Sequence, residues 1–103
     1  MALYFEELWV KDPTPAKMKE FVQMMSAVFK EGPAAVGAQL PVRFVAGPWA
    51  SNEEAKIFLI LDVADHTPSY TVFSKLIAQG LVEKRRFTPI VEWSEVEKMV
   101  TQL

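Results

Sequence analysis

The spacing of apolar and polar residues along the chain predicts four strands and three helices. Four short runs are rich in branched and aromatic side chains, as strands usually are; they cover residues 3–10, 42–46, 56–63 and 83–93. Apolar residues at helical spacing cover residues 18–29, 70–77 and 96–103. The predicted order is strand, helix, strand, strand, helix, strand, followed by a short terminal helix.

Local signals indicate where these elements begin and end. Threonine before proline favours a helix start, glycine favours a helix end, and serine with glutamate three residues later forms a capping box. These signals are Thr14-Pro15 and Thr67-Pro68 for starts, Gly32-Pro33 and Gly80 for ends, and Ser94–Glu97 for the box. Residues 33–41 are expected to be a loop, and Gly47-Pro48 is expected to end the second strand. Pro89 indicates that the fourth strand is an edge or bulged strand.

This order predicts an α+β fold of the ferredoxin-like type, with a βαββαβ arrangement and a four-stranded antiparallel sheet. A chain of 103 residues has room for one core, so residues 1–103 form a single domain.

The strands also predict self-association, because helices in this fold cover only one face of the sheet. A face in contact with water would alternate with polar residues, but the two central strands are largely apolar on both faces. The first divides into Leu3, Phe5, Glu7 and Trp9 against Tyr4, Glu6, Leu8 and Val10; the third divides into Ile57, Leu59, Leu61 and Val63 against Phe58, Ile60 and Asp62. We therefore expect a homodimer in which the uncovered faces pack together.

The element order, the length and the two-sided strands resemble the dimeric α/β-barrel superfamily, in which two ferredoxin-like subunits join their sheets. Residues 47–63, which begin Gly47-Pro48-Trp49, and the later segment Phe87-Thr88-Pro89-Ile90-Val91 resemble a small bacterial domain family of unknown function within that group. The resemblance implies a dimeric barrel. It also implies an enzyme of the cofactor-free monooxygenase or isomerase type as one reading.

Composition and charge exclude several function classes. The formal net charge is -2, which does not favour nucleic acid. The third predicted strand has no glycine and only one aromatic residue, where an RNA-recognition motif has several. No run approaches the roughly 20 apolar residues that span a bilayer. The chain has no cysteine and one histidine, and it carries no phosphate-binding loop, so we expect no metal and no cofactor. A soluble, cytoplasmic protein is expected.

Adjacent carboxylates on the first strand are the first candidates for chemistry. Successive side chains of a strand point to opposite faces, so either Glu6 or Glu7 faces the uncovered cleft. We favour Glu6, grouped with Tyr4 and with Asp62 on a neighbouring strand taken as parallel. A carboxylate in an apolar cavity has a raised pKa and can act as an acid or a base; the alternative is a structural ion pair.

Four further residues are expected to line the same cleft. Arg43 and Arg86 could anchor an anionic ligand, pair with Glu6 or Asp62, or be solvated. His66 could be a base near the cavity mouth or a surface residue. Phe58 is expected on the uncovered face of the sheet, on the same strand as Asp62. The run Lys84-Arg85-Arg86 is expected to shield an edge strand. Tyr4 and the tryptophans could line a pocket for a flat organic molecule; core or interface positions are the alternative.

Three functions remain open from sequence. The leading one is a homodimeric barrel protein that binds a small, partly apolar molecule in the sheet cleft. The alternatives are the enzyme named above and a purely structural or interaction module. Whether the protein is an enzyme, and what it binds, are left undecided.

Overall fold

Four strands and three helices follow one another in the predicted order. The computed structural model describes residues 2–31, 42–67 and 69–103. The strands are β1 (Ala2–Val10), β2 (Val42–Ala50), β3 (Lys56–Val63) and β4 (Val82–Ile90). The helices are α1 (Pro15–Glu31), α2 (Ser69–Ala78) and α3 (Trp93–Thr101). The predicted Gly32-Pro33 helix end and the 33–41 loop lie outside the described residues.

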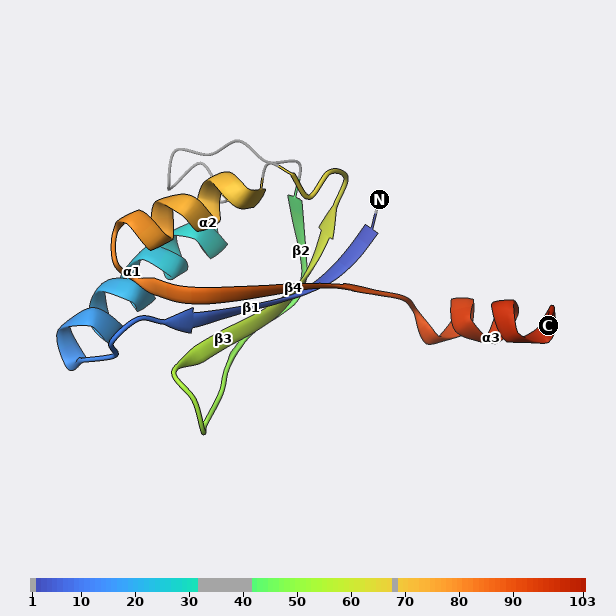
Figure 1. Ribbon diagram of the computed structural model, residues 1–103, viewed down its shortest axis with the longest axis horizontal. Helices are drawn as coiled ribbons and strands as arrows, with labels where there is room; N and C mark the ends of the chain where they lie inside the picture. Colours follow the sequence, from blue (N-terminus) through green and yellow to red (C-terminus); the bar gives the residue numbers. More distant parts are fainter. Residues whose placement is uncertain (1, 32–41, 68) are drawn as a thin grey trace.

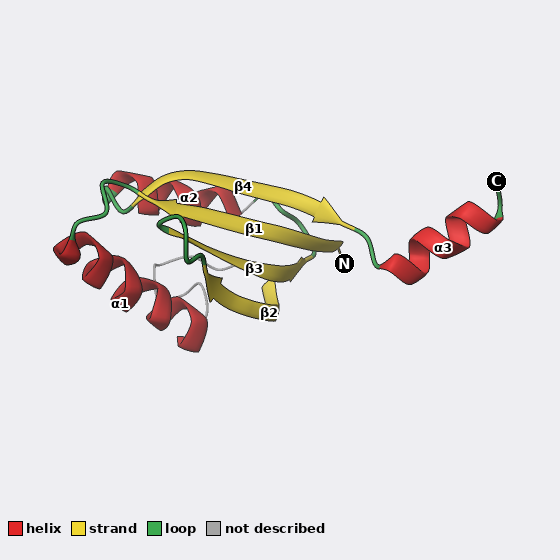
Figure 2. Ribbon diagram, turned by 90° about the horizontal axis from the view of Figure 1, so that it is seen from below, coloured by secondary structure: helices red, strands yellow, loops and turns green. Residues whose placement is uncertain are grey.

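The strands form one sheet in the order β2-β3-β1-β4 (Figure 2). Every neighbouring pair is antiparallel, so our expectation that Asp62 lies on a parallel neighbour of β1 is wrong. Helix α1 connects β1 to β2 and helix α2 connects β3 to β4, while a hairpin joins β2 directly to β3. Helices α1 and α2 lie on the same side of the sheet (Figure 1). The ferredoxin-like α+β fold is confirmed.

The core lies between the sheet and these two helices. Its larger part is a set of buried side chains from β1, α1, α2 and the start of β4: Leu8, Val10, Phe21, Met25, Leu76, Leu81 and Val82. A second part comes from one face of β3: Leu59, Leu61 and Val63. The predicted stripe on α2 is too wide, because Tyr70 and Ile77 are exposed while Leu76 is buried. The face of α2 that packs against the sheet is therefore narrower than the apolar spacing of residues 70–77 predicted.

Two of the predicted helix boundaries are confirmed by their hydrogen bonds. The Thr14 hydroxyl accepts a hydrogen bond from the Lys17 backbone N–H at 3.2 Å, which caps α1. At the end of α2, Gly80 adopts φ +72°, and the N–H groups of Gly80 and Leu81 donate to the carbonyls of Ile77 and Leu76. This is a Schellman ending, in which glycine takes the left-handed position at no steric cost, and it carries Leu81 directly into the core.

The predicted capping box is wrong. Helix α3 begins at Trp93, its N-cap is Glu92, and no side chain caps it. Because the helix begins before Ser94, that serine lies within the first turn and not at the cap.

The two edge strands differ from their predicted bounds. Strand β2 runs on past Gly47-Pro48 to Ala50, with register shifts between Phe44 and Ala46 and between Ala46 and Trp49. An edge strand tolerates such irregularities and a missing N–H, because one of its sides pairs with no other strand. Strand β4 begins at Val82 and ends at Ile90, so Pro89 lies near its end on the other sheet edge.

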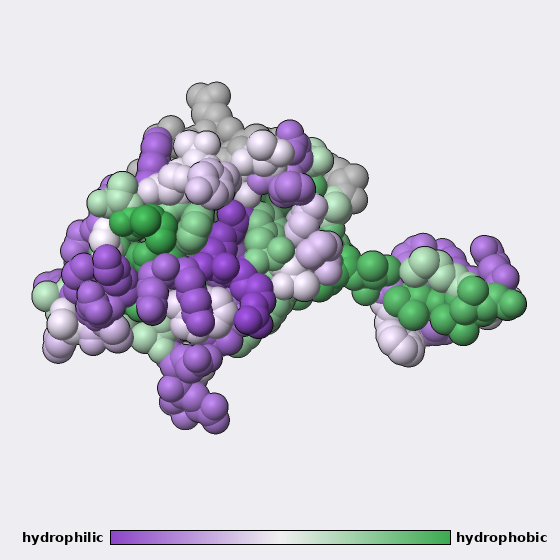
Figure 3. Space-filling view, viewed as in Figure 1, coloured by the Kyte–Doolittle hydropathy of each residue, from purple (hydrophilic) through white to green (hydrophobic). Residues whose placement is uncertain are grey.

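Helix α3 projects away from the rest of the molecule beyond the end of β4 (Figures 1 and 2). None of its residues is buried, and apolar side chains gather along it in the space-filling view (Figure 3). Trp93, Met99 and Val100 are among the exposed ones. Within the described part of the chain, no helix is both long and apolar enough to cross a membrane. The cytoplasmic location stays a prediction.

Two valines of α1 test this account of the core. Val28 is 5% exposed and Val22 is 54% exposed. We expect Val28→Ala to lower the free energy of unfolding by about 2 kcal/mol, from lost burial and the cavity left behind, and Val22→Ala to change it by less than about 0.5 kcal/mol. Urea unfolding of both variants measures the difference. Equal losses would mean that α1 packs on the sheet through another face.

Candidate functional site

The two faces of β1 carry different chemistry. Tyr4, Glu6, Leu8 and Val10 point toward the helices, because Leu8 and Val10 belong to the helix-side core. Leu3, Phe5, Glu7 and Trp9 therefore point to the uncovered face. Our expectation that Glu6 faces the uncovered cleft is wrong; Glu7 does. The reason is the antiparallel register, which places Glu6 opposite Leu59, a core residue of β3.

A cleft of about 500 Å³ opens on the helix side, between the start of α2 and strands β1 and β4. Aromatic and polar side chains line it: Tyr4, His66, Thr67, Ser69, Tyr70, Arg85, Phe87 and Pro89. Its volume lies within the range of ordinary small-molecule sites. Tyr4 and Phe87 meet edge to face with ring centroids 4.4 Å apart, and the His66 ring lies 5.9 Å from that of Tyr4. The structure thus brings together two of the predicted site residues, Tyr4 and His66.

Arg85 is the central polar residue of this cleft, and sequence reasoning missed it. Its side chain is 10% exposed and stacks on Phe87, with Cζ 4.0 Å from the ring centroid. Nη2 donates a hydrogen bond of 2.7 Å to the hydroxyl of Ser69. Nε is buried and has no acceptor among the described residues. A buried donor without a partner is costly, so this guanidinium retains hydrogen-bonding capacity.

Glu6 lies beside Arg85, with Oε2 3.6 Å from Nη2 and a side chain 14% exposed. Burial raises the pKa of Glu6 above its ordinary value, and the charge of Arg85 opposes this shift. Burial likewise lowers the pKa of Arg85, against the charge of Glu6. Glu6 also lines an inner, mainly apolar cavity of about 60 Å³ between the sheet and the helices. Ser69 lines both spaces, so these three residues stand between the open cleft and the inner cavity.

The loop before α2 is shaped by local hydrogen bonds. The Asp65 carboxylate accepts a hydrogen bond of 3.0 Å from the Thr67 backbone N–H, and this bond lowers the pKa of Asp65 below its ordinary value. Ser69 donates from its hydroxyl to the His66 carbonyl at 2.5 Å while accepting from Arg85. The serine therefore links the loop to the guanidinium. His66 itself is exposed, on the cleft's outer wall.

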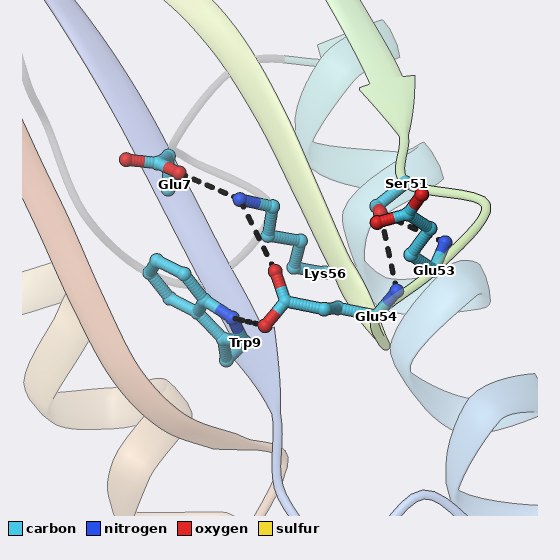
Figure 4. A network of polar contacts seen from close by, with 6 residues as sticks. All are labelled: Glu7, Trp9, Ser51, Glu53, Glu54 and Lys56. Atoms are coloured by element: carbon cyan, nitrogen blue, oxygen red, sulfur yellow. Dashed lines mark hydrogen bonds and ion pairs between the residues drawn. The ribbon is translucent and has the colours of Figure 1, made fainter.

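The uncovered face carries a separate polar network around Lys56 (Figure 4). Its ammonium lies 2.8 Å from Glu7 Oε2 and 3.5 Å from Glu54 Oε2, and the hydrogen bond to Glu7 raises the pKa of Lys56. Trp9 Nε1 reaches Glu54 Oε1 at 3.5 Å. The Trp9 ring also lies under Lys84 Nζ at 4.5 Å. Glu7 is thus held as an ion-pair partner at one end of this face.

The other predicted site residues lie on this uncovered face as well. Arg43 Nη2 pairs with Asp62 Oδ2 at 3.1 Å, which is one of the alternatives weighed for Arg43. Glu7 pairs in register with Arg86 on β4 and with Phe58 on β3, so both residues share its face of the sheet. The sheet therefore separates Arg43, Phe58, Asp62 and Arg86 from Tyr4, Glu6 and His66. The seven residues do not form a single site.

The tryptophans do not form a pocket with Tyr4. Trp9 lies on the uncovered face, Trp49 at the β2 edge, and Trp93 on α3 with 73% of its surface exposed. Tyr4 instead lines the helix-side cleft together with Tyr70 and Phe87, so the predicted grouping of Tyr4 with the tryptophans is wrong.

The part of the chain that the structure describes contains no cluster of side chains that could hold a metal ion. No group of three or more histidine and carboxylate side chains gathers there. The polar groups of the cleft suit an organic ligand: a guanidinium and hydroxyls act as donors between aromatic walls.

Comparison with known proteins adds little beyond the fold. No family model matches the chain, and no curated protein matches it. Among solved structures, the chain is similar to the crystal structure of an uncharacterized NIPSNAP domain protein from Burkholderia xenovorans, at 15% identity. The similarity covers 89% of this chain and 94% of that one, with a TM-score of 0.48. The barrel superfamily and its small bacterial family stay predictions.

The burial of Glu6 predicts a pH dependence of stability. Because its folded-state pKa is raised above the ordinary value of 4.5, folding favours the protonated form. The stability that Glu6 contributes is then full below its unfolded pKa and is lost as pH rises through the folded pKa. We expect the free energy of unfolding of the wild type, relative to Glu6→Gln, to fall between pH 4 and pH 7. Urea unfolding across this range measures it.

Glu20→Gln is the matched control, because Glu20 is exposed on α1. Its difference from the wild type should stay flat over the same range. A rise with pH for Glu6→Gln would contradict the burial of this carboxyl.

Proposed function

We propose that this protein binds a small, partly apolar molecule in the cleft between α2, β1 and β4. The observation that carries the proposal is Arg85, a charged donor that is nine-tenths buried and lines the aromatic cleft. Buried polar groups are usually satisfied by protein, water or ligand. An acceptor on the ligand would bind the part of the guanidinium that lines the cleft, and the aromatic walls would cover the rest of the molecule.

The cleft also supports the proposal by its shape and composition. Tyr70 is 66% exposed, so a large aromatic surface stands at the opening without cover. Phe87 and Tyr4 lie deeper and are half-buried. Small-molecule sites typically combine such apolar walls with a few convergent polar groups. Arg85 and Ser69 are two of those groups, and Glu6 lies next to Arg85 on the inner cavity.

Binding can be tested with 2-acetylnaphthalene, a flat probe that carries one carbonyl. In titrations followed by backbone amide NMR, we expect the largest shifts at the cleft residues. Arg85→Met should weaken binding by roughly tenfold or more, the cost of one charge-assisted hydrogen bond. Arg86→Met is the matched control, because Arg86 is adjacent on β4 but points to the other face; its affinity should equal that of the wild type.

A second variant covers the case in which Arg85→Met does not fold. Tyr70→Ala removes an exposed side chain and should weaken binding severalfold through lost ring contact. Unchanged affinity in both variants, or shifts confined to the uncovered face, would refute the cleft as the site.

An enzyme that transfers protons is the second candidate function. One observation favours it: the buried carboxyl of Glu6, with its raised pKa, lies 3.6 Å from a guanidinium that could stabilise developing negative charge. A carboxyl group tuned toward neutral pH is suited to acid–base work. The substrate would need an acidic C–H next to a carbonyl.

We also infer that the uncovered sheet face packs against a second copy of the chain. The centre of this face is apolar, with Phe5, Phe58 and Ile60 half-buried and the two phenylalanine rings 5.8 Å apart. Near its edge, Asp62 Oδ2 pairs with Arg43 at 3.1 Å, so charge lies beside this apolar centre and not within it.

The distribution of charge on this face suits a copy of itself. Asp62 lies opposite Leu3, and Lys84 lies opposite Trp9. These positions are about 20 Å apart along β1 at the usual rise per residue. A two-fold arrangement with the strands reversed would bring the Lys84 and Arg86 end of one copy to the Asp62 end of the other.

The dimer predicts a solution mass of twice 11.7 kDa at micromolar concentration. Phe58→Glu should give the mass of one chain, because it places an unpaired charge in the centre of the interface. Thr88→Glu, at an exposed position of the same face, should weaken the dimer even if Phe58→Glu does not fold. Val22→Glu, at an exposed position of α1 away from this sheet face, should leave the mass unchanged. Light scattering measures all four; a single-chain mass for the wild type rules out the dimer.

A further inference from the structure

The ion pair at the cleft determines which ligand charge the site accepts. Glu6 and Arg85 are 14% and 10% exposed at their side chains, so water screens neither of them well. With both groups ionised, their formal charges cancel. A ligand in the cleft therefore meets a guanidinium that has a carboxylate 3.6 Å away on the side of the inner cavity, and not a free positive charge.

The two partners treat a ligand oxygen differently. A neutral carbonyl oxygen can accept a hydrogen bond from the guanidinium without displacing Glu6. A carboxylate oxygen would also be attracted to Arg85, but it would be repelled by Glu6, and like charges brought together in a buried site are strongly disfavoured. The pair thus acts as a filter against anions.

The walls define the rest of the ligand. Tyr4, Tyr70 and Phe87 present ring surfaces to the cleft, while the inner cavity beyond Glu6 is too small, at about 60 Å³, for more than a small group. A flat ring system in the open cleft, with its carbonyl turned toward Arg85, uses all of these features.

We propose that the cleft selects neutral, flat, carbonyl-bearing molecules, and that Glu6 excludes the corresponding carboxylates. This inference rests on the proposed binding function and adds the chemical class of the ligand. Glu6 is a positioning and selectivity residue in this account, because it acts by holding Arg85 and by its charge.

Two probes with the same rings separate the classes: 2-acetylnaphthalene and 2-naphthoate, titrated at pH 8 with NMR detection. We expect the wild type to bind the ketone at least roughly tenfold more tightly than the carboxylate. Glu6→Gln leaves Arg85 with a net positive charge, so naphthoate affinity should rise by a similar factor while ketone affinity changes little.

Glu7→Gln is the matched control, because Glu7 is adjacent on β1 but lies on the other face. It should keep the preference of the wild type. If the wild type binds naphthoate as tightly as the ketone, the inference on selectivity is wrong while the binding function stands. If neither probe shifts the cleft residues, both are wrong. Should Glu6→Gln not fold, the comparison of probes on the wild type decides.

Discussion

Two neighbouring glutamates on the central strand β1 lie in different environments, because helices cover only one face of the sheet. Glu6 lies under the helices beside Arg85, and Glu7 lies on the uncovered face beside Lys56. Alternation along a strand forces this separation. The two main polar networks among the described residues, around Arg85 and around Lys56, each belong to one of these two sides.

The buried pair on the helix side is a poor way to gain stability. Taking two charges out of water costs free energy, and an apolar pair of similar volume often stabilises a fold as well or better. Here Arg85 Nε lacks an acceptor among the described residues, so the pair is also incompletely satisfied. The cation–aromatic contact with Phe87 and the bond to Ser69 recover part of this cost.

The elements of the fold could be predicted from sequence because each has its own local signal. Thr14 and Gly80 mark helix ends through bonds that they make with nearby backbone groups. The direction in which β1 faces could not be read from that strand alone, since both of its faces are apolar with one glutamate each. The register with β3 carried the missing information: Leu59 and Leu61 form an aliphatic face without polar residues, and Glu6 pairs with Leu59.

Arg85 was missed for a different physical reason. In a regular strand that begins with the core residue Val82, Lys84 and Arg86 would point inward. Strand β4 contains an irregularity: Val10 pairs with Val82 but Trp9 pairs with Lys84, so one extra residue shifts the alternation. Arg85 and Phe87 then face the helices. Counting back from Phe87 would have found this, but nothing local in the charged run distinguishes its middle member.

Helix α3 makes no packed contact with the body of the protein among the described residues. A helix of nine residues is marginal in water by itself, and α3 has no buried residue and stands away from the body. Only Val91 and Glu92 separate it from β4. Among the described residues, the apolar side of α3 and the centre of the uncovered sheet face are two apolar surfaces without a partner. The cleft differs from them, because its aromatic walls and its guanidinium all come from a single chain; the proposed ligand site is therefore complete without the proposed dimer.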